Sequence, residues 1–411
     1  MRISLFLSSL IAVAVLAVGG YYAYRYVVET PPSWLVALVT SPREPAPPLP
    51  SGDAAPLTVP EGFIATIYSR ETPGARVLAR DQKGTILVSL TSEGKVVALP
   101  DADQDQKADR TVTIVENLND PHGILVHCPS ADNCLLYVAE TNAVKSYAYD
   151  ADTHAANYVE TLTTLPSGNG HYTRTLLMHP DGRRLLVSIG SSCNVCEEVS
   201  PLRASVAAID LSTNTTTVFA GGLRNTVFMA LDPVTGEIWG TDNGRDLIGD
   251  DIPPDEVNII REGGDYGWPI CYGKNIHDTD FDRKQYIRDP CADRVPSHLD
   301  LQAHSAALGL AFIPEEGWPE EYALDLLVAF HGSWNRSEPT GYKVVRIDLD
   351  NARNARGAPV DFVSGFLPAG GAGASDAIGR PVSLLAEPGG SVYLSDDRAG
   401  AVYKISRTSL D

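Results

Sequence analysis

Residues 180–188 read Pro-Asp-Gly-Arg-Arg-Leu-Leu-Val-Ser, a tight-turn sequence followed by a short apolar strand that ends in a small polar residue. Comparable strands recur at a spacing of about 50 residues, with a longer gap after the fourth. They are Ile86–Ser89, Leu136–Ala139, Leu185–Ser188, Glu237–Gly240, Leu326–Ala329 and Ser391–Leu394. A further strand follows each of them, at Lys95–Leu99, Ala143–Tyr149, Ala204–Ile209, Glu256–Ile260, Tyr342–Ile347 and Ala401–Ile405.

A period of this length, built from short antiparallel strands, is typical of a β-propeller, in which each blade buries its faces against its neighbours. The sequence therefore predicts an all-β fold, a six-bladed β-propeller. An extra strand at Gly62–Tyr68 can complete the last blade and join the two ends of the domain. A β-sandwich of similar composition is the alternative, but a sandwich does not require a repeating phase.

The composition agrees with a large folded β domain and excludes some partners. Of the 411 residues, 44% are hydrophobic and 20% are charged, which is far from a disordered composition. Glycine (35) and proline (29) are plentiful, as a turn-rich protein requires. The formal net charge of -20 argues against nucleic acid as a partner and against a general affinity for anionic membrane surfaces.

The N-terminus contains an apolar stretch from Ile3 to Tyr24 that is long enough to cross a bilayer as a helix. We expect an uncleaved anchor; a cleaved signal peptide with its site near Ala17-Val18-Gly19 is the alternative. The predicted segments are residues 1–28 as signal-anchor or signal peptide, 29–58 as a Pro-rich tether, and 59–411 as the propeller. This places the domain in the periplasm or elsewhere outside the cytoplasm. It is expected to be anchored to the inner membrane by residues 3–24, its only membrane contact, or soluble if the signal is cleaved.

The six cysteines fall into three pairs that are close in sequence, and disulfides persist outside the cytoplasm. Proximity predicts the pairs Cys128–Cys134, Cys193–Cys196 and Cys271–Cys291. The Cys-x-x-Cys spacing of the second pair also permits a zinc or redox site, but no second such motif or paired histidines accompany it.

Aligned on the repeat, almost every blade carries a polar residue at the start of its first strand, where propellers line their central channel. These residues are Arg76, His122, His171, Arg174, Arg224, Asn225, His304 and Arg380. Convergence of side chains that are distant in sequence is what a ligand site requires. Because cations gathered in one place repel unless an anion offsets them, we expect an anionic ligand. The alternative is that each arginine pairs with a carboxylate from a neighbouring blade, such as Asp242 or Asp396.

An acidic element lies at Thr241–Asp246 and continues through Asp250, Asp251, Asp255 and Glu256. Oxygen ligands crowded on glycine-containing turns suit a hard cation such as calcium, although a solvated acidic loop is an equal alternative and the spacing is not that of an EF-hand.

These residues belong to short motifs that occur together, in order, between about Pro60 and Arg407. The motifs are Pro-Glu-Gly-Phe (60–63), Pro-His-Gly (121–123), His-Tyr-Thr-Arg (171–174), Gly-Leu-Arg-Asn (222–225), Asp-Glu (255–256), Tyr-Gly-Trp-Pro (266–269), His-Gly-Ser-Trp-Asn-Arg (331–336), Gly-Tyr-Lys (341–343) and Gly-Arg-Pro (379–381). With them the chain resembles the PQQ-dependent sugar dehydrogenases of the soluble glucose dehydrogenase and L-sorbosone dehydrogenase type, which are six-bladed propellers.

The resemblance implies a quinoprotein enzyme that oxidises a sugar, an aldose or a related alcohol or aldehyde by hydride transfer to PQQ. An electron acceptor that the sequence does not identify would then be a further partner. His171 is the implied general base, and Arg224 is implied to stabilise the negative charge that grows on the quinone oxygen. Further residues implied at the cofactor or in the channel beside it are His122, Asn225, Trp334, Arg336, Lys343 and Arg380.

The resemblance also implies calcium as a second cofactor. The carbonyl groups of Gly244 and Arg245 correspond to those that hold the ion next to PQQ. Asp255, Glu256 and the carbonyl of Tyr266 fall at or beside a second calcium site.

Two other functions remain open from the residues. One is a calcium-dependent lactonase-type hydrolase on the same fold, whose channel is expected to carry inward Glu, Asn and Asp. The other is a propeller that binds a carbohydrate or a protein without catalysis. The Arg- and His-rich channel argues against the first, and the presence of His171, Arg224, Asn225 and Lys343 argues against the second.

Overall fold

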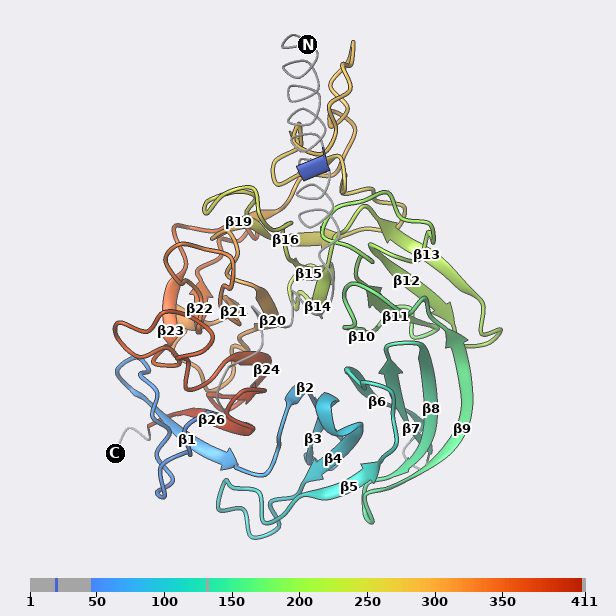
Figure 1. Cartoon of the computed structure of the whole chain (residues 1–411). Helices are drawn as coiled ribbons and strands as arrows, with labels where there is room; N and C mark the ends of the chain where they lie inside the picture. The colour runs from blue at the N-terminus through green and yellow to red at the C-terminus, as the bar shows by residue number, and fades with distance from the viewer. Residues whose placement is uncertain (1–18, 21–45, 131–132, 409–411) are drawn as a thin grey trace, which may run out of the picture.

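The structure is a computed structural model that describes residues 19–20, 46–130 and 133–408. In these residues, six four-stranded antiparallel sheets surround a central axis as the blades of a propeller (Figure 1). The expected six-bladed propeller is thereby confirmed, and all six second strands of the repeat occupy the same place in their blades.

The first three blades follow one another along the chain, each running from the axis outward. Blade 1 consists of β2 (Ala75–Arg80), β3 (Ile86–Leu90), β4 (Lys95–Leu99) and β5 (Val112–Val115). Blade 2 consists of β6 (Gly123–Ser130), β7 (Asn133–Glu140), β8 (Ala143–Asp150) and β9 (Ala155–Thr164). Blade 3 consists of β10 (Leu176–Met178), β11 (Arg184–Ile189), β12 (Ser205–Asp210) and β13 (Thr216–Gly221).

Blades 4 to 6 keep this order with one interruption. Blade 4 consists of β14 (Thr226–Leu231), β15 (Ile238–Asp242), β16 (Asp255–Ile260) and β19 (Leu299–Leu301). Blade 5 consists of β20 (Ala307–Phe312), β21 (Leu326–Phe330), β22 (Lys343–Ile347) and β23 (Val360–Val363). Blade 6 consists of β24 (Pro381–Glu387), β25 (Ser391–Asp396), β26 (Ala401–Arg407) and β1 (Phe63–Ser69). Two short 3₁₀ turns occur at Thr91–Glu93 and Glu320–Tyr322.

The ring closes as expected, because the first strand of the domain completes the last blade. Strand β1 pairs antiparallel with β26, with Phe63 opposite Arg407 and Ala65 opposite Ile405. Residues just before β1 also lie on the propeller, where Thr58 pairs with Ser364 and Leu57 packs against the core beneath blades 5 and 6. The chain thus holds its two ends together through one sheet.

The small polar residue that recurs in the second strands joins neighbouring blades. In blade 1, the Ser89 hydroxyl accepts from Val77 N (3.0 Å) and donates to the carbonyl of His122 in blade 2 (2.7 Å). Ser395 likewise links blade 6 to blade 1 by donating to Arg76 O at 2.6 Å, and Thr241 links blade 4 to blade 5 by donating to Leu308 O at 2.6 Å. These buried hydroxyls pair polar backbone groups next to the channel that the sheets leave unpaired.

The long insertion after β16 contains the fourth strand of its blade. A hairpin of β17 (Cys271–Tyr272) and β18 (Ile276–His277) comes first, the Cys271–Cys291 disulfide closes the insertion, and β19 then returns to the sheet beside β16. The other two disulfides are also as predicted, Cys128–Cys134 and Cys193–Cys196.

Most of the predicted anchor and tether, residues 1–18 and 21–45, lies outside the described residues. No helix of the described part has both the length and the apolar character needed to cross a membrane.

Candidate functional site

The polar residues expected at the channel occupy equivalent places in the blades. His122, Arg224 with Asn225, and Arg380 stand directly before β6, β14 and β24, the innermost strands in Figure 1, and Arg76 is the second residue of β2. His171 and Arg174 precede β10, and His304 precedes β20. Their contacts bring them together in two groups, one around Arg224 and one around Asp397.

The first group contains the predicted base, His171, in a fixed tautomer. Its Nδ1 lies 3.1 Å from the carbonyl oxygen of Ser191 and 3.0 Å from the Ser191 hydroxyl. Since the carbonyl can only accept, and the hydroxyl donates its proton to Cys193 O at 2.7 Å, Nδ1 must carry the hydrogen. Nε2 is then the lone-pair nitrogen, and no described residue hydrogen-bonds to it.

The imidazole of His171 is neutral in the cofactor-free protein. Burial and the nearby Arg224 guanidinium lower its pKa to about 3. A neutral imidazole with a fixed proton on Nδ1 and a lone pair on Nε2 can accept a proton there, as a general base must. Asn225 is close by, since a Cβ added to Gly190 would lie 2.6 Å from His171 Cβ and would also clash with Asn225 Oδ1, a buried oxygen without a partner in the described chain.

Arg224 is 5% exposed, and its guanidinium group donates hydrogen bonds to three residues. Asn194 accepts from it twice, at its main-chain oxygen and its Oδ1, both at 2.9 Å. Asn243 O accepts at 3.0 Å and the Asp246 carboxylate at 3.2 Å. Asp246 also accepts from Asn335 of blade 5 at 2.9 Å, so the arginine is part of a network that spans three blades.

The second group joins blades 1, 5 and 6. Asp397 accepts from Arg76 at 2.7 Å and lies 3.0 Å from His331 Nε2. Arg380 donates to the carbonyls of His331 (3.1 Å) and Gly332 (2.9 Å). Burial would raise the pKa of Asp397, but His331 and the two arginines lower it well below its ordinary range, so Asp397 is an anion.

Tyr172 and His122 occupy the space between the groups. The Arg76 guanidinium lies 5.9 Å from the Tyr172 ring centroid, and the His122 ring lies 6.4 Å from the same ring. His122 is fully buried, its Nδ1 is 3.3 Å from the Thr175 hydroxyl, and its Nε2 has no partner in the described chain.

Neighbouring arginines act on three histidines of this region. The pKa values of His122, His171 and His331 are all lowered, the last to about 4, and after burial the largest cause in each case is a neighbouring arginine: Arg76, Arg224 and Arg380 respectively. The alternative of pairing with carboxylates holds in part, with Asp397 for Arg76 and Asp246 for Arg224. The suggested partners Asp242 and Asp396 instead accept backbone N–H groups of Asn225 and Arg380.

Three other predicted residues lie in different surroundings. Lys343 forms an ion pair with Asp361 on the outermost strand β23 at 2.6 Å. Arg336 contacts the acidic loop after β15, through the Asp250 carbonyl and the Asp251 carboxylate (3.2 Å). Trp334 is half-buried, two residues before Arg336 in the same loop. The contacts of Lys343 and Arg336 therefore do not place them in either group.

Four of the five predicted calcium ligands, all but Asp255, line a small pocket in blade 4. Its lining includes Asp242, Gly244, Arg245, Glu256 and Tyr266, together with Arg224 and Asp278. The carbonyl oxygens of Gly244, Arg245 and Tyr266 accept no hydrogen bond from a described residue, whereas those of Asn243 and Asp246 on either side do accept one. Free carbonyl oxygens next to buried carboxylates form a donor set that fits a hard cation.

Little positive charge lies near the carboxylates of this pocket to compensate them. Burial raises the pKa of Asp242 to about 6 and that of Glu256 to about 7. Asp255, with a pKa raised by burial to about 7, does not line the pocket and accepts from the backbone of Gly244 (3.0 Å) and Ala307 (3.3 Å). Arg245 is neutralised by Asp278 at 2.8 Å.

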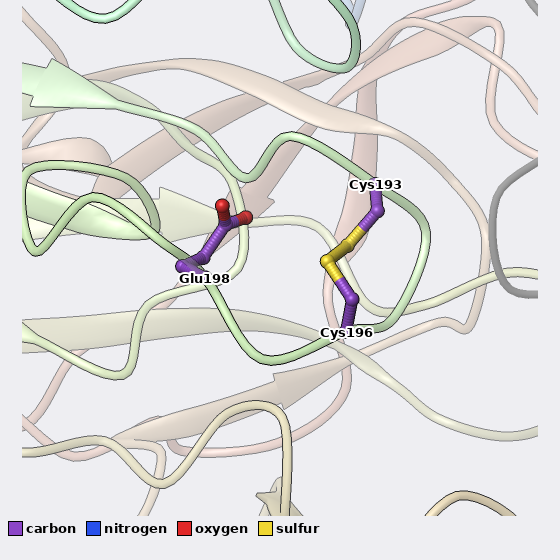
Figure 2. A group of neighbouring side chains, drawn as sticks. All are labelled: Cys193, Cys196 and Glu198. Carbon is purple, nitrogen blue, oxygen red and sulfur yellow. A yellow bond between two sulfur atoms is a disulfide. The ribbon is translucent and has the colours of Figure 1, made fainter.

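The described residues contain two clusters of side chains that could hold a metal ion, each with its ligand atoms within 4.8 Å of one another. Neither cluster includes the carboxylates of this pocket. One is the exposed acidic loop of Asp101, Asp103 and Asp105. The other is Cys193, Cys196 and Glu198, but Figure 2 shows its two sulfur atoms joined in a disulfide, which removes the thiolates that a zinc ion needs. Glu198 accepts from Ser192 N (2.6 Å) and Oγ (2.7 Å).

Five residues of the site were not identified from the sequence: Ser191, Asn194, Asp246, His331 and Asp397. His331 stands in a quoted motif, and Asn194 stands between the two cysteines of another. Asp397 follows β25 at the end of the second-strand position, so the repeat alignment extended by a few residues would have found it.

Comparison with known proteins agrees with the fold and the motifs. The TrAA12-like family matches residues 57–408. An uncharacterized protein of Borreliella burgdorferi is 32% identical over 364 residues, which cover 85% of this chain and 90% of that protein. A PQQ-dependent pyranose dehydrogenase of Coprinopsis cinerea is 26% identical over 392 residues, 81% of this chain and 52% of that one. The chain thus spans about half the length of this relative.

Solved structures show the same fold. A calcium structure of the Trichoderma reesei carbohydrate-active enzyme of family AA12 has a TM-score of 0.73 at 22% identity and covers 87% of this chain and 98% of that one. The holo form of the PQQ domain of the Coprinopsis cinerea pyranose dehydrogenase has a TM-score of 0.71 at 23% identity, with 88% and 99% covered. The resemblance to PQQ-dependent sugar dehydrogenases is confirmed, and the chain belongs to the TrAA12-like family.

Proposed function

We propose that this protein is a PQQ-dependent oxidoreductase that oxidises a hydroxyl or aldehyde group of a sugar or related compound. The observation that carries the proposal is the channel mouth. There a neutral histidine with its lone pair on Nε2 lies beside a fixed arginine, and arginines dominate the field around three histidines. Such a field favours an anion, and PQQ is a tricarboxylate.

PQQ, when bound, supplies a quinone that accepts the hydride of the substrate. His171 removes the hydroxyl proton at Nε2, while its Nδ1–H stays on the Ser191 carbonyl and keeps the ring oriented. An anionic cofactor raises the pKa of this imidazole from its cofactor-free value, because negative charge stabilises the imidazolium. Proton transfer to Nε2 therefore becomes easier in the loaded enzyme.

Arg224 supplies a fixed positive charge for the negative charge that develops on an oxygen during the reaction. Its network keeps the guanidinium in place without reorganisation. Asn225 and Arg380 are the other residues that could hold carboxylate or quinone oxygens. His122 belongs to the wall next to them. Lys343 could join them by leaving Asp361.

Calcium is the second proposed cofactor. It would be held by the carbonyl oxygens of Gly244 and Arg245, and in a neighbouring position by Glu256 with the carbonyl of Tyr266. Asp255 braces the loop that presents the carbonyls. A bound cation would stabilise the ionised forms of the buried carboxylates.

We also infer that the domain works outside the cytoplasm, where its three disulfides persist, and that residues 3–24 anchor it to a membrane or are removed as a signal. The electron acceptor is then a redox partner in the same compartment.

The test is reconstitution of the purified protein with PQQ, with and without calcium. Quenching of tryptophan fluorescence measures binding, and reduction of a redox dye measures turnover over a panel of aldoses, alcohols and aldehydes. We expect saturable PQQ binding and dye reduction that requires both PQQ and a substrate. PQQ binding without any turnover would instead favour the binding-only propeller, and calcium-dependent lactone hydrolysis without PQQ would favour the hydrolase.

A further inference from the structure

The loop between β11 and β12 contacts both residues of the proposed chemistry. Ser191, at its start, orients His171, and the Ser191 hydroxyl is itself held by the carbonyl of Cys193 at 2.7 Å. Asn194, the next residue, holds Arg224. Two groups on different blades are thus positioned from four consecutive residues, and Cys193–Cys196 closes this segment (Figure 2).

Asn194 makes an unusually complete set of contacts for one side chain. Its main-chain oxygen and Oδ1 accept from Nε and Nη2 of Arg224, which is a two-pronged grip on one guanidinium. The same Oδ1 accepts from Asp246 N at 2.8 Å, and Nδ2 donates to Asp246 O at 3.1 Å. Asn194 therefore fixes the arginine and the backbone of the residue whose carboxylate neutralises it.

Asn194 can hold Arg224 in this way only if its backbone is fixed, because one of these four hydrogen bonds is accepted by its main-chain carbonyl oxygen. The disulfide supplies that constraint, since it ties the residues on both sides of Asn194-Val195. Asn194 is 5% exposed and Val195 is fully buried, so the segment lies inside the protein.

We propose that Asn194, held by the Cys193–Cys196 disulfide, is a positioning residue that sets the place of Arg224 at the channel mouth. The disulfide is on this view a part of the site and not a general staple of the fold. What Arg224 does there rests on the proposed function, but its placement by Asn194 does not.

The first test needs no cofactor. Phenylglyoxal modifies accessible guanidinium groups, and peptide mass mapping measures the rate at each arginine. Asn194→Ala should raise the labelling rate of Arg224 by about tenfold, because the bond from Nη2 to Oδ1 disappears together with the two side-chain bonds that hold Asp246 beside the guanidinium. The buried Arg353, which lies between β22 and β23 and pairs with Asp232 after β14 at 2.8 Å, is the internal control and should stay protected.

Two control variants, one for the asparagine and one for the disulfide, separate an effect on the position of Arg224 from an effect on folding. Asn214→Ala removes an asparagine at the opposite end of β12, where it contacts Glu160, and should leave Arg224 protected. Cys193→Ser with Cys196→Ser should expose Arg224, whereas Cys128→Ser with Cys134→Ser in blade 2 should not. An unchanged Arg224 labelling rate in both Asn194→Ala and the Cys193/Cys196 variant overturns the proposal.

The second test uses PQQ affinity in a double-mutant cycle. If Asn194 acts through Arg224, Asn194→Ala weakens PQQ binding by about tenfold in the wild type and changes it by less than about twofold when Arg224 is already alanine. Equal losses in both backgrounds would show an independent structural effect and contradict the proposal. If the wild type binds no PQQ, the proposed function fails while the labelling experiment still decides the role of Asn194.

Discussion

At the scale of single residues, His171 is the group on which the proposed chemistry depends. Its ring is fixed through Nδ1, so a change at Nε2 can remove the base without removing the cofactor. His171→Gln should keep PQQ affinity within about threefold and lower turnover by about 100-fold or more, the usual contribution of a positioned base. Parallel fluorescence titration and dye reduction measure the two effects. Normal turnover in this variant would remove His171 from the mechanism.

The same residue predicts how the cofactor-free protein responds to acid. The pKa of His171 is about 3 in the folded protein and 6.5 as its ordinary value, so between these values the unfolded chain binds a proton that the folded chain does not. The contribution of His171 to stability therefore falls as the pH decreases through this window, by about 1–2 kcal/mol between pH 7 and pH 5, while the buried carboxylates with raised pKa values contribute in the opposite direction. Urea unfolding at both pH values should show the wild type losing about 1–2 kcal/mol of stability relative to His171→Gln, and a difference between the two proteins that does not change with pH would contradict the prediction.

A site residue could be predicted from the sequence when it stands in phase with the repeat. His171, Arg224 and Arg380 stand at the same phase of a repeat, so the sequence places them on one mouth of the channel. Asn194 and Asp246 act across blades through backbone atoms and a loop that no period describes. Their role depends on three-dimensional proximity, for which the single sequence has no signal.

At the scale of elements, the loop that joins β15 to β16 is the part that the proposed calcium ion would contact. Glu256 lines the pocket beside this loop, as do Gly244 and Arg245, whose carbonyl oxygens accept no hydrogen bond from a described residue. Glu256→Gln should raise by about tenfold the free calcium concentration that PQQ binding requires, because a carboxylate binds a hard cation more strongly than an amide. The measurement is PQQ affinity against free calcium after chelation with EDTA.

The control for this experiment is Asp103→Asn, in the exposed acidic loop between β4 and β5. It should not alter the calcium dependence. PQQ affinity that is the same in EDTA and in calcium would exclude an ion at the loop.

Strand prediction was limited at this same region. The second and third strands of each blade were located to within a few residues, since turn sequences and apolar runs mark them locally. Strand β19 was missed because it is three residues long and follows an insertion of about 40 residues closed by a disulfide. Its identity as the outermost strand of blade 4 is determined by pairing with β16, a long-range contact.

At the scale of the whole molecule, the closure of the ring by β1 was predictable because six blades of equal phase leave one strand over. The ring has no other covalent connection between its first and last blades, so the contacts of β1 decide whether it stays closed. Phe63 is the main apolar contact of this strand. Its ring centroid lies 5.5 Å from that of Phe362 on β23 and 5.7 Å from that of Trp318 in the β20–β21 loop. Both belong to blade 5, so Phe63 joins blades 5 and 6.

Phe63→Ala should therefore destabilise the domain by about 3–4 kcal/mol, the usual cost of removing a buried phenyl ring. The neighbouring Ile64 points outward with 47% of its surface exposed, and Ile64→Ala should cost less than about 0.5 kcal/mol. Urea unfolding of both variants gives the comparison on one strand with the same backbone pairing. Because the channel residues stand on other strands, Phe63→Ala should bind PQQ as the wild type does well below its unfolding temperature. Equal stability of the two variants would mean that backbone pairing with β26, and not the packing of Phe63, keeps the propeller closed.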